Sequence, residues 1–69
     1  MSNTKLNIDE INELIPKAII YMLEYGATLR VLQKRLNLGY SASAQLMDEL
    51  EKRGFVGEYK GGQPREILK

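Results

Sequence analysis

Cysteine and histidine are both absent from the 69-residue sequence. Without cysteine, the chain has no disulfide framework, no thiol nucleophile and no cysteine-based zinc site. Without histidine, it lacks the commonest metal ligand and the usual general base of enzymes. Acidic side chains do gather at Asp48, Glu49 and Glu51, but beside Lys52 and Arg53 they have the pattern of solvated helix charges. We therefore expect a protein that is not an enzyme and that has no cofactor and no metal ion.

Long apolar runs are also missing. The longest, AIIYML at residues 18–23, is too short to cross a bilayer. The polar N-terminus MSNTKLN lacks the apolar segment of a signal peptide. We expect a cytoplasmic protein with no membrane contact, encoded as a complete small gene of a bacterium, phage or plasmid. The length leaves room for one domain, expected over residues 7–69 after a flexible N-terminal segment at 1–6.

Positive charge is unevenly distributed along the chain. Residues 1–29 carry two Lys against four Asp or Glu, a net charge of −2. Residues 30–69 carry eight Lys or Arg against five Asp or Glu, a net charge of +3. The asymmetry favours nucleic-acid contact by the second part of the chain, although the same charges are also compatible with an ordinary solvated surface.

The first helical region begins with a capping signal. Asn7 can cap a helix over residues 8–15, and Glu10 completes a capping box. Pro16 is costly in a helix interior, so we expect a break near that residue and a second helix over 16–25. This second helix is rich in apolar residues, which predicts burial on more than one side: Ala18, Ile19, Ile20, Met22 and Leu23.

The next helix is expected over residues 29–37, after Gly26 ends its predecessor and Thr28 caps the new one. Apolar residues at three- and four-residue spacing predict its core face: Leu29, Leu32 and Leu36. The basic residues fall mostly on the opposite side: Arg30, Lys34 and Arg35.

A tight turn and a third helix follow. Gly39 is expected to supply the permissive backbone of the turn, and Ser41 to cap a helix over 41–53 that stops at Gly54. Its inner stripe is predicted to contain Ala44, Met47 and Leu50, with Leu46 at the edge.

The C-terminal residues change to a two-residue period. FVGEY alternates as a strand does, KGGQP has the composition of a turn, and REILK can return as a second strand. The expected β-hairpin has a basic tip with Lys60 and Arg65. Three to four helices followed by a C-terminal β-hairpin wing predict an α+β fold, the winged helix-turn-helix.

A set of motifs supports this fold. Leu32-Gln33 precedes two basic residues, Leu38-Gly39-Tyr40 forms the turn, and a Leu/Met-Asp-x-Leu-Glu run occupies 46–51. Further motifs follow in the C-terminal part: Gly54, Val56-Gly57, Pro64-Arg65-Glu66 and Ile67-Leu68. With these motifs the chain resembles, over roughly residues 14–68, the C-terminal gamma domain of the FtsK/SpoIIIE DNA translocases.

The resemblance implies a winged helix that binds short oriented DNA sequences and reads them with its third helix. Where that family typically has an Asn and then two Arg, this chain has Ser41, Ala42 and Gln45. Where its wing usually has a Lys, this chain has Gln63, while Arg65 is retained. The ATPase motor of the family is missing, because no Walker P-loop occurs.

Two functional hypotheses follow. The first is a free-standing regulatory protein that binds double-stranded DNA weakly or with altered specificity, because each lost arginine–guanine contact removes about 1–3 kcal/mol of discrimination. Ser41, Ser43 and Gln45 would face the bases. The basic residues would hold the backbone: Arg30, Lys34, Arg35, Lys60 and Arg65.

The second hypothesis is an adaptor that does not bind DNA itself and docks on a host DNA-bound regulator. The small, uncharged SASA start of the third helix suits contact with a protein. The tyrosines are candidate interface anchors: Tyr21, Tyr25, Tyr40 and Tyr59. A homodimer formed through the Pro16 helix is a third alternative.

Overall fold

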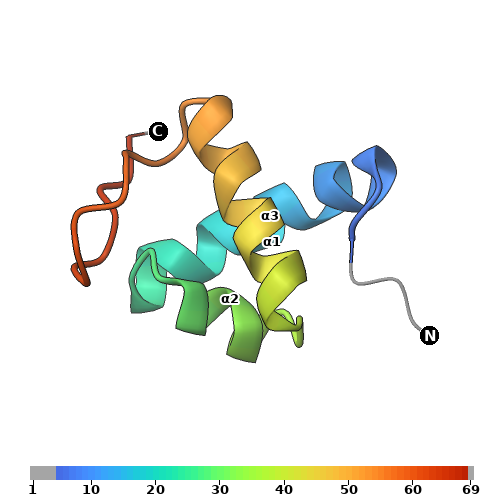
Figure 1. The fold of residues 1–69 in the computed structure, drawn as a ribbon, viewed down its shortest axis with the longest axis horizontal. Helices are drawn as coiled ribbons and strands as arrows, with labels where there is room; N and C mark the ends of the chain where they lie inside the picture. Colours follow the sequence, from blue (N-terminus) through green and yellow to red (C-terminus); the bar gives the residue numbers. More distant parts are fainter. Residues whose placement is uncertain (1–4, 69) are drawn as a thin grey trace.

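The structure, a computed structural model, describes residues 5–68. It contains three helices, α1 (Ile8–Tyr25), α2 (Leu29–Arg35) and α3 (Tyr40–Lys52), each of which packs against the other two. Figure 1 shows α3 crossing α1, with α2 beside their crossing and residues 53–68 looping back along the end of α1. Residues 1–4 of the expected flexible N-terminal segment lie outside the described part of the chain.

Both ends of α1 agree with the prediction. The Asn7 side chain accepts a hydrogen bond from the Glu10 amide at 2.8 Å, and Glu10 Oε1 accepts one from the Asn7 amide at 2.9 Å. This reciprocal pair is the predicted capping box. At the other end, Gly26 has a φ of 108°, a left-handed conformation that side chains with a Cβ rarely adopt.

The predicted break at Pro16 is wrong, because α1 continues through it. The reason lies in the spacing of the residues that α1 buries, Ile11, Ile15, Ala18 and Met22. They recur at four, three and four residues and so form one uninterrupted stripe across the position of the proline. Pro16 itself is exposed, so its ring displaces no core side chain.

The predicted burial of α1 on more than one side is also wrong. Ala18 and Met22 are buried, but Ile20 is 62% exposed and Leu23 is 64% exposed. Both α2 and α3 pack on the stripe side of α1, and no described element covers the opposite side. Apolar composition alone therefore overestimated how much of this helix a chain of 69 residues can cover.

Thr28 caps α2 as predicted, since its Oγ1 accepts a hydrogen bond from the Val31 amide at 3.2 Å. The helix ends at Arg35, two residues before the predicted end. In the turn that follows, Asn37 has a φ of 57°, whereas Gly39 has a φ of −73°. The permissive backbone position is therefore Asn37, and the role predicted for Gly39 is wrong; Asn is the non-glycine residue that adopts this conformation most easily.

Gly39, rather than Ser41, is the N-cap of α3, so the predicted cap is wrong. The buried face of α3 is also rotated from the predicted one: Ala42, Ser43, Leu46, Met47 and Leu50. Leu46 is fully buried at the centre of this face rather than at its edge, and Ala44 is only partly buried.

The predicted β-hairpin wing, and with it the α+β fold class, is wrong, because residues 5–68 contain no strand. Gly54 does stop α3, with a φ of 80°. Beyond it the chain reverses through the isolated bridges Val56–Ile67 and Lys60–Gln63. Pro64 has no amide hydrogen to donate. The Arg65 amide donates instead to the Ala27 carbonyl at 2.9 Å, which takes the returning chain away from a hairpin ladder.

The core lies where the three helices meet. It is closed by residues from every element, and its largest fully buried apolar side chains come from α1, α2, α3 and the C-terminal segment, residues 53–68: Met22, Leu32, Leu46, Leu50 and Val56. Because this core is small, the position of each helix depends on few side chains.

We expect Pro16→Ala to stabilise the protein. The proline removes one helical hydrogen bond and clashes with the preceding turn, a penalty of about 3 kcal/mol that the loss of its rigidity in the unfolded chain partly offsets. The free energy of unfolding in urea is predicted to rise by about 1–3 kcal/mol. Lys17→Ala, an exposed neighbour in the same helix, is the control and is expected to change it by about 0.5 kcal/mol or less. An unchanged or lower stability of Pro16→Ala would contradict this account of α1.

Candidate nucleic-acid interface

The exposed positive charge of the helical region is concentrated on α2. Arg30, Lys34 and Arg35 are all exposed, and no carboxylate of residues 5–68 forms an ion pair with them. Arg30 and Lys34 are one helical turn apart and share a face. The Arg35 guanidinium lies over the ring of Tyr25. This arrangement presents three uncompensated cations on a helix of seven residues.

The N-terminus of α3 adds a second feature that attracts anions. Its cap, Gly39, has no side chain to accept hydrogen bonds from the first amides of the helix. Ser41, in this first turn, is exposed as the predicted DNA-contacting role requires. Amides at a helix N-terminus bind phosphate well because they point outward and carry the positive end of the helix dipole.

Ser43, which was predicted to face the bases, and the candidate contact residue Ala42 both face the core. Ala42 is 7% exposed and Ser43 is fully buried. The Ser43 hydroxyl has no hydrogen-bond partner among the described residues. A group must reach the groove to read a base edge. In this structure neither side chain does so.

Gln45 is held by the segment before α1. Its Oε1 accepts a hydrogen bond from the Leu6 amide at 2.7 Å, and its Nε2 donates one to the Leu6 carbonyl at 2.8 Å. Leu6 also packs against the core. The side-chain amide thus pairs with a main-chain amide, as neighbouring strands do, and both of its polar atoms are in use. Each of these two atoms keeps one further hydrogen-bonding position, but the amide plane is oriented towards Leu6, so the bidentate contact with adenine that Gln can make would require the side chain to leave Leu6.

Beyond its first turns, α3 presents negative charge. Asp48 and Glu51 are exposed, and Glu49 pairs with Arg53 at 3.1 Å. The helix carries three acidic residues against Lys52 alone. Because Glu49 is paired with Arg53 and Glu51 with Arg65, these later turns offer phosphate no uncompensated positive charge comparable to that of α2.

The predicted basic tip has only one exposed cation. Lys60 and Gln63 are exposed and form the bridge that closes the turn. Arg65 is different, because its Nη1 donates to Glu51 Oε1 at 2.9 Å and to the Gly57 carbonyl at 3.3 Å. Its side chain is only 14% exposed. Arg65 therefore ties the C-terminal segment to α3.

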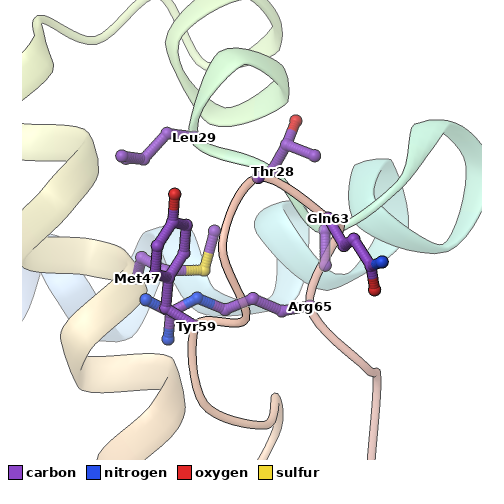
Figure 2. Close-up of a pocket in the computed structure, with 8 residues that line it drawn as sticks. Thr28, Leu29, Met47, Tyr59, Gln63 and Arg65 are labelled. Carbon is purple, nitrogen blue, oxygen red and sulfur yellow. The ribbon is translucent and has the colours of Figure 1, made fainter.

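A pocket of about 210 Å³ lies between the start of α2, the middle of α3 and the C-terminal segment. Figure 2 shows its mostly apolar lining, with the Arg65 side chain extending towards Tyr59 and Met47. Because Arg65 is paired with Glu51, the pocket offers apolar contact and little charge.

Residues 5–68 contain no group of acidic side chains placed to hold a metal ion. None of the helices they form is both long and apolar enough to span a membrane.

Sequence reasoning missed Leu6, Glu51 and the open cap at Gly39. Leu6 and Gln45 are 39 residues apart, and no local pattern reports such a pair. Gly at the position before Tyr40 was the available signal for the cap, because Gly is an acceptable N-cap that contributes no side-chain hydrogen bond.

Comparison with known proteins points to one family. The family model for the FtsK gamma domain matches residues 9–69. The chain is 48% identical over 66 residues to the DNA translocase SpoIIIE of Bacillus subtilis, and 41% identical over 66 residues to the DNA translocase FtsK of Halalkalibacterium halodurans. Each match covers 94% of this chain and 8% of the relative. A third relative, the DNA translocase FtsK of Caldanaerobacter subterraneus, is 37% identical over 97% of this chain and 10% of its own length. The chain thus spans a tenth or less of these relatives.

Ser43→Ala is expected to increase stability, because it removes a buried hydroxyl that has no partner and leaves only a small void. The free energy of unfolding in urea should rise by about 1 kcal/mol. Ser41→Ala removes an exposed hydroxyl from the same helix and should change it by about 0.5 kcal/mol or less. Destabilisation by Ser43→Ala would show that the hydroxyl has a partner in solution.

Gln45→Ala is expected to release the segment before α1. The Leu6 amide then loses its acceptor, so its hydrogen exchange, followed by NMR, should become at least tenfold faster, about 1.4 kcal/mol of lost protection. Exchange in the centre of α1 should change much less. Unchanged protection of the Leu6 amide would contradict the role assigned to Gln45.

Proposed function

The chain belongs to the FtsK gamma domain family, and on that premise we propose that it is a DNA-binding module that holds duplex DNA weakly and with little sequence preference. The relatives are DNA translocases by name, whereas this chain corresponds to a tenth or less of them. The proposal therefore concerns binding and does not extend to translocation. Its regulatory role, its cytoplasmic location and its lack of catalytic activity are parts of the same proposal.

The proposal rests on the observation that the basic side chains of α2 form no ion pair with an acidic side chain among residues 5–68. On α2, Arg30, Lys34 and Arg35 are exposed and have no carboxylate partner among residues 5–68. They lie directly before the uncapped start of α3 in the chain. Both features attract phosphate, and neither depends on the identity of a base. Contact with the DNA backbone is therefore the binding mode that the exposed charges favour.

Weak binding follows from the small number of such charges. Three cations on α2 and Lys60 at the tip could release about three to four counterions, and non-specific complexes of this kind have dissociation constants of roughly 10⁻⁶ to 10⁻⁴ M. Low sequence preference follows from α3. Of its four candidate contact residues, Ala42 and Ser43 are buried and Gln45 is bonded to Leu6, which leaves Ser41.

A second candidate function is supported by the exposed apolar residues. Tyr40 and Tyr59 are each 66% exposed, and Ile20 and Leu23 are exposed on the outer side of α1. Such residues are typical of protein interfaces. A co-regulator that docks on a DNA-bound host protein would use them, with or without a second copy of the chain.

Fluorescence anisotropy with random duplex DNA tests the proposal. We expect binding in the micromolar range or weaker at about 50 mM salt, and a log–log salt slope of about −3. The double variant with Arg30→Ala and Lys34→Ala should make the slope shallower by about 2, because it removes two phosphate contacts. Lys17→Ala removes an exposed cation from α1 and should leave the slope unchanged. Absence of binding at low salt would exclude the DNA hypothesis and favour the protein-docking candidate.

A further inference from the structure

Arg35 differs from the other two cations of α2 in what surrounds it. Its guanidinium carbon lies 3.9 Å from the centroid of the Tyr25 ring, within the range of a close cation–π contact. Tyr25 in turn stacks on Tyr21, with the ring centroids 6.5 Å apart and the ring planes 29° apart. The last turn of α1 thus supplies an aromatic support for a cation at the last turn of α2. Nothing comparable is found at Arg30 or Lys34 among residues 5–68.

Stacking restrains the guanidinium without using its donors. A guanidinium that lies over a ring is held through its face, while its five N–H groups lie in its plane and point away from the contact. No described residue accepts a hydrogen bond from Arg35, and the residue is exposed. The donors are therefore unused among residues 5–68 and remain available for a bidentate bond to an oxyanion.

The support matters because a free arginine loses side-chain entropy when it binds. Arg30 and Lys34 are exposed and have no ion pair, side-chain hydrogen bond or cation–π contact among residues 5–68, so each must be immobilised mainly by the ligand itself. Arg35 has lost part of this freedom before any ligand arrives. At equal distance from a phosphate, it should therefore contribute more affinity than either neighbour.

We propose, on the basis of the DNA-binding function proposed above, that Arg35 is the main phosphate anchor of this surface and that Tyr25 is its positioning residue. The anion is a phosphate of the DNA backbone. A carboxylate on a partner protein would offer the same bidentate geometry, but Arg35 shares its helix with two further cations that have no carboxylate partner among residues 5–68. A row of cations matches a row of phosphates better than it matches a single carboxylate.

Salt titration separates the two roles. The slope reports how many cations contact phosphate, and the affinity at one salt concentration reports how well they are placed. For Arg35→Ala, the slope should become shallower by about 1 and binding should weaken more than for Arg30→Ala or Lys34→Ala. For Arg35→Lys, the slope should stay the same while binding weakens, because an ammonium cannot form the bidentate bond.

Tyr25 provides the decisive variants. Tyr25→Leu keeps an apolar side chain but removes the aromatic face, so binding should weaken about two- to fivefold with an unchanged slope. Tyr25→Phe keeps the face and should bind as the unaltered protein does. The urea midpoint of each variant is measured alongside. An unchanged midpoint excludes the possibility that weaker DNA binding results from a general loss of structure.

Inorganic phosphate at matched ionic strength serves as competitor. It should displace DNA no better than other salts, since the anchor requires the DNA backbone.

The proposal is overturned if Tyr25→Leu binds DNA as tightly as Tyr25→Phe, or if Arg35→Ala leaves the slope unchanged while the unaltered protein binds. In either case the DNA-binding function stands and only the anchor is lost. If the unaltered protein does not bind DNA even at low salt, both proposals fail together. Displacement by inorganic phosphate beyond that of other salts, if it persists in Arg35→Ala, would place the phosphate site elsewhere on the protein and also overturn the anchor.

Discussion

The apolar stripe along α1 is the constraint on which the rest of the structure depends. Its members, Ile11, Ile15, Ala18 and Met22, form the only side of α1 that α2 and α3 cover within residues 5–68. Burial of the continuous stripe keeps the helix intact through Pro16. The free energy gained from burying these apolar side chains offsets the penalty of a proline inside a helix. Because α2 and α3 also pack on each other, the stripe closes a single core that all three helices share.

That constraint also determines what the candidate interface can present. Because α3 must place Leu46, Met47 and Leu50 against the stripe, the neighbouring small residues Ala42 and Ser43 turn inward with them. The outward side of α3 then combines an uncapped N-terminus with acidic later turns. The exposed cations of the candidate interface are therefore on α2. This helix fully buries only Leu32, so its basic side chains remain at the surface.

Local signals in the sequence predicted both ends of α1, the start of α2 and the stop of α3, but not the cap of α3, which is Gly39 and not Ser41. The capping box at Asn7, the Thr28 cap and the glycines at 26 and 54 are all found as expected, because each depends on chemistry within a few residues. Family membership was likewise predictable from motifs spread along the chain, and the family model confirms it. Apart from the turn before α3, where Asn37 and Gly39 have other roles than expected, the predictions that failed required tertiary knowledge. Pro16 was judged by local cost alone, and the phase of α3 was misread because Ala and Ser are compatible with either face.

The sequence predicted which basic residues of the candidate site are exposed, but not which side chains form long-range contacts. The exposure of Arg30, Lys34 and Arg35 followed from helical spacing. The partners of Gln45 and Arg65 did not, since they lie 39 and 14 residues away and each removes a polar side chain from the available surface. The strands of the expected wing depended on a ladder that Pro64 and the Arg65–Ala27 bond interrupt. Whether the ten predicted contact residues bind DNA stays a prediction.

The way the C-terminal segment is attached has a consequence for how such a domain can diverge. The Arg65 amide attaches it to the Ala27 carbonyl, and two further main-chain hydrogen bonds, Leu68 to Phe55 and Gly57 to Glu66, hold its two arms together. None of these bonds depends on the side chains at the tip, residues 58–63, where Gly61 and Gly62 adopt positive φ angles. The tip can therefore change its charge or length over evolutionary time while its anchorage persists. Mutation can alter what this end of the molecule touches without first finding a new way to hold it in place.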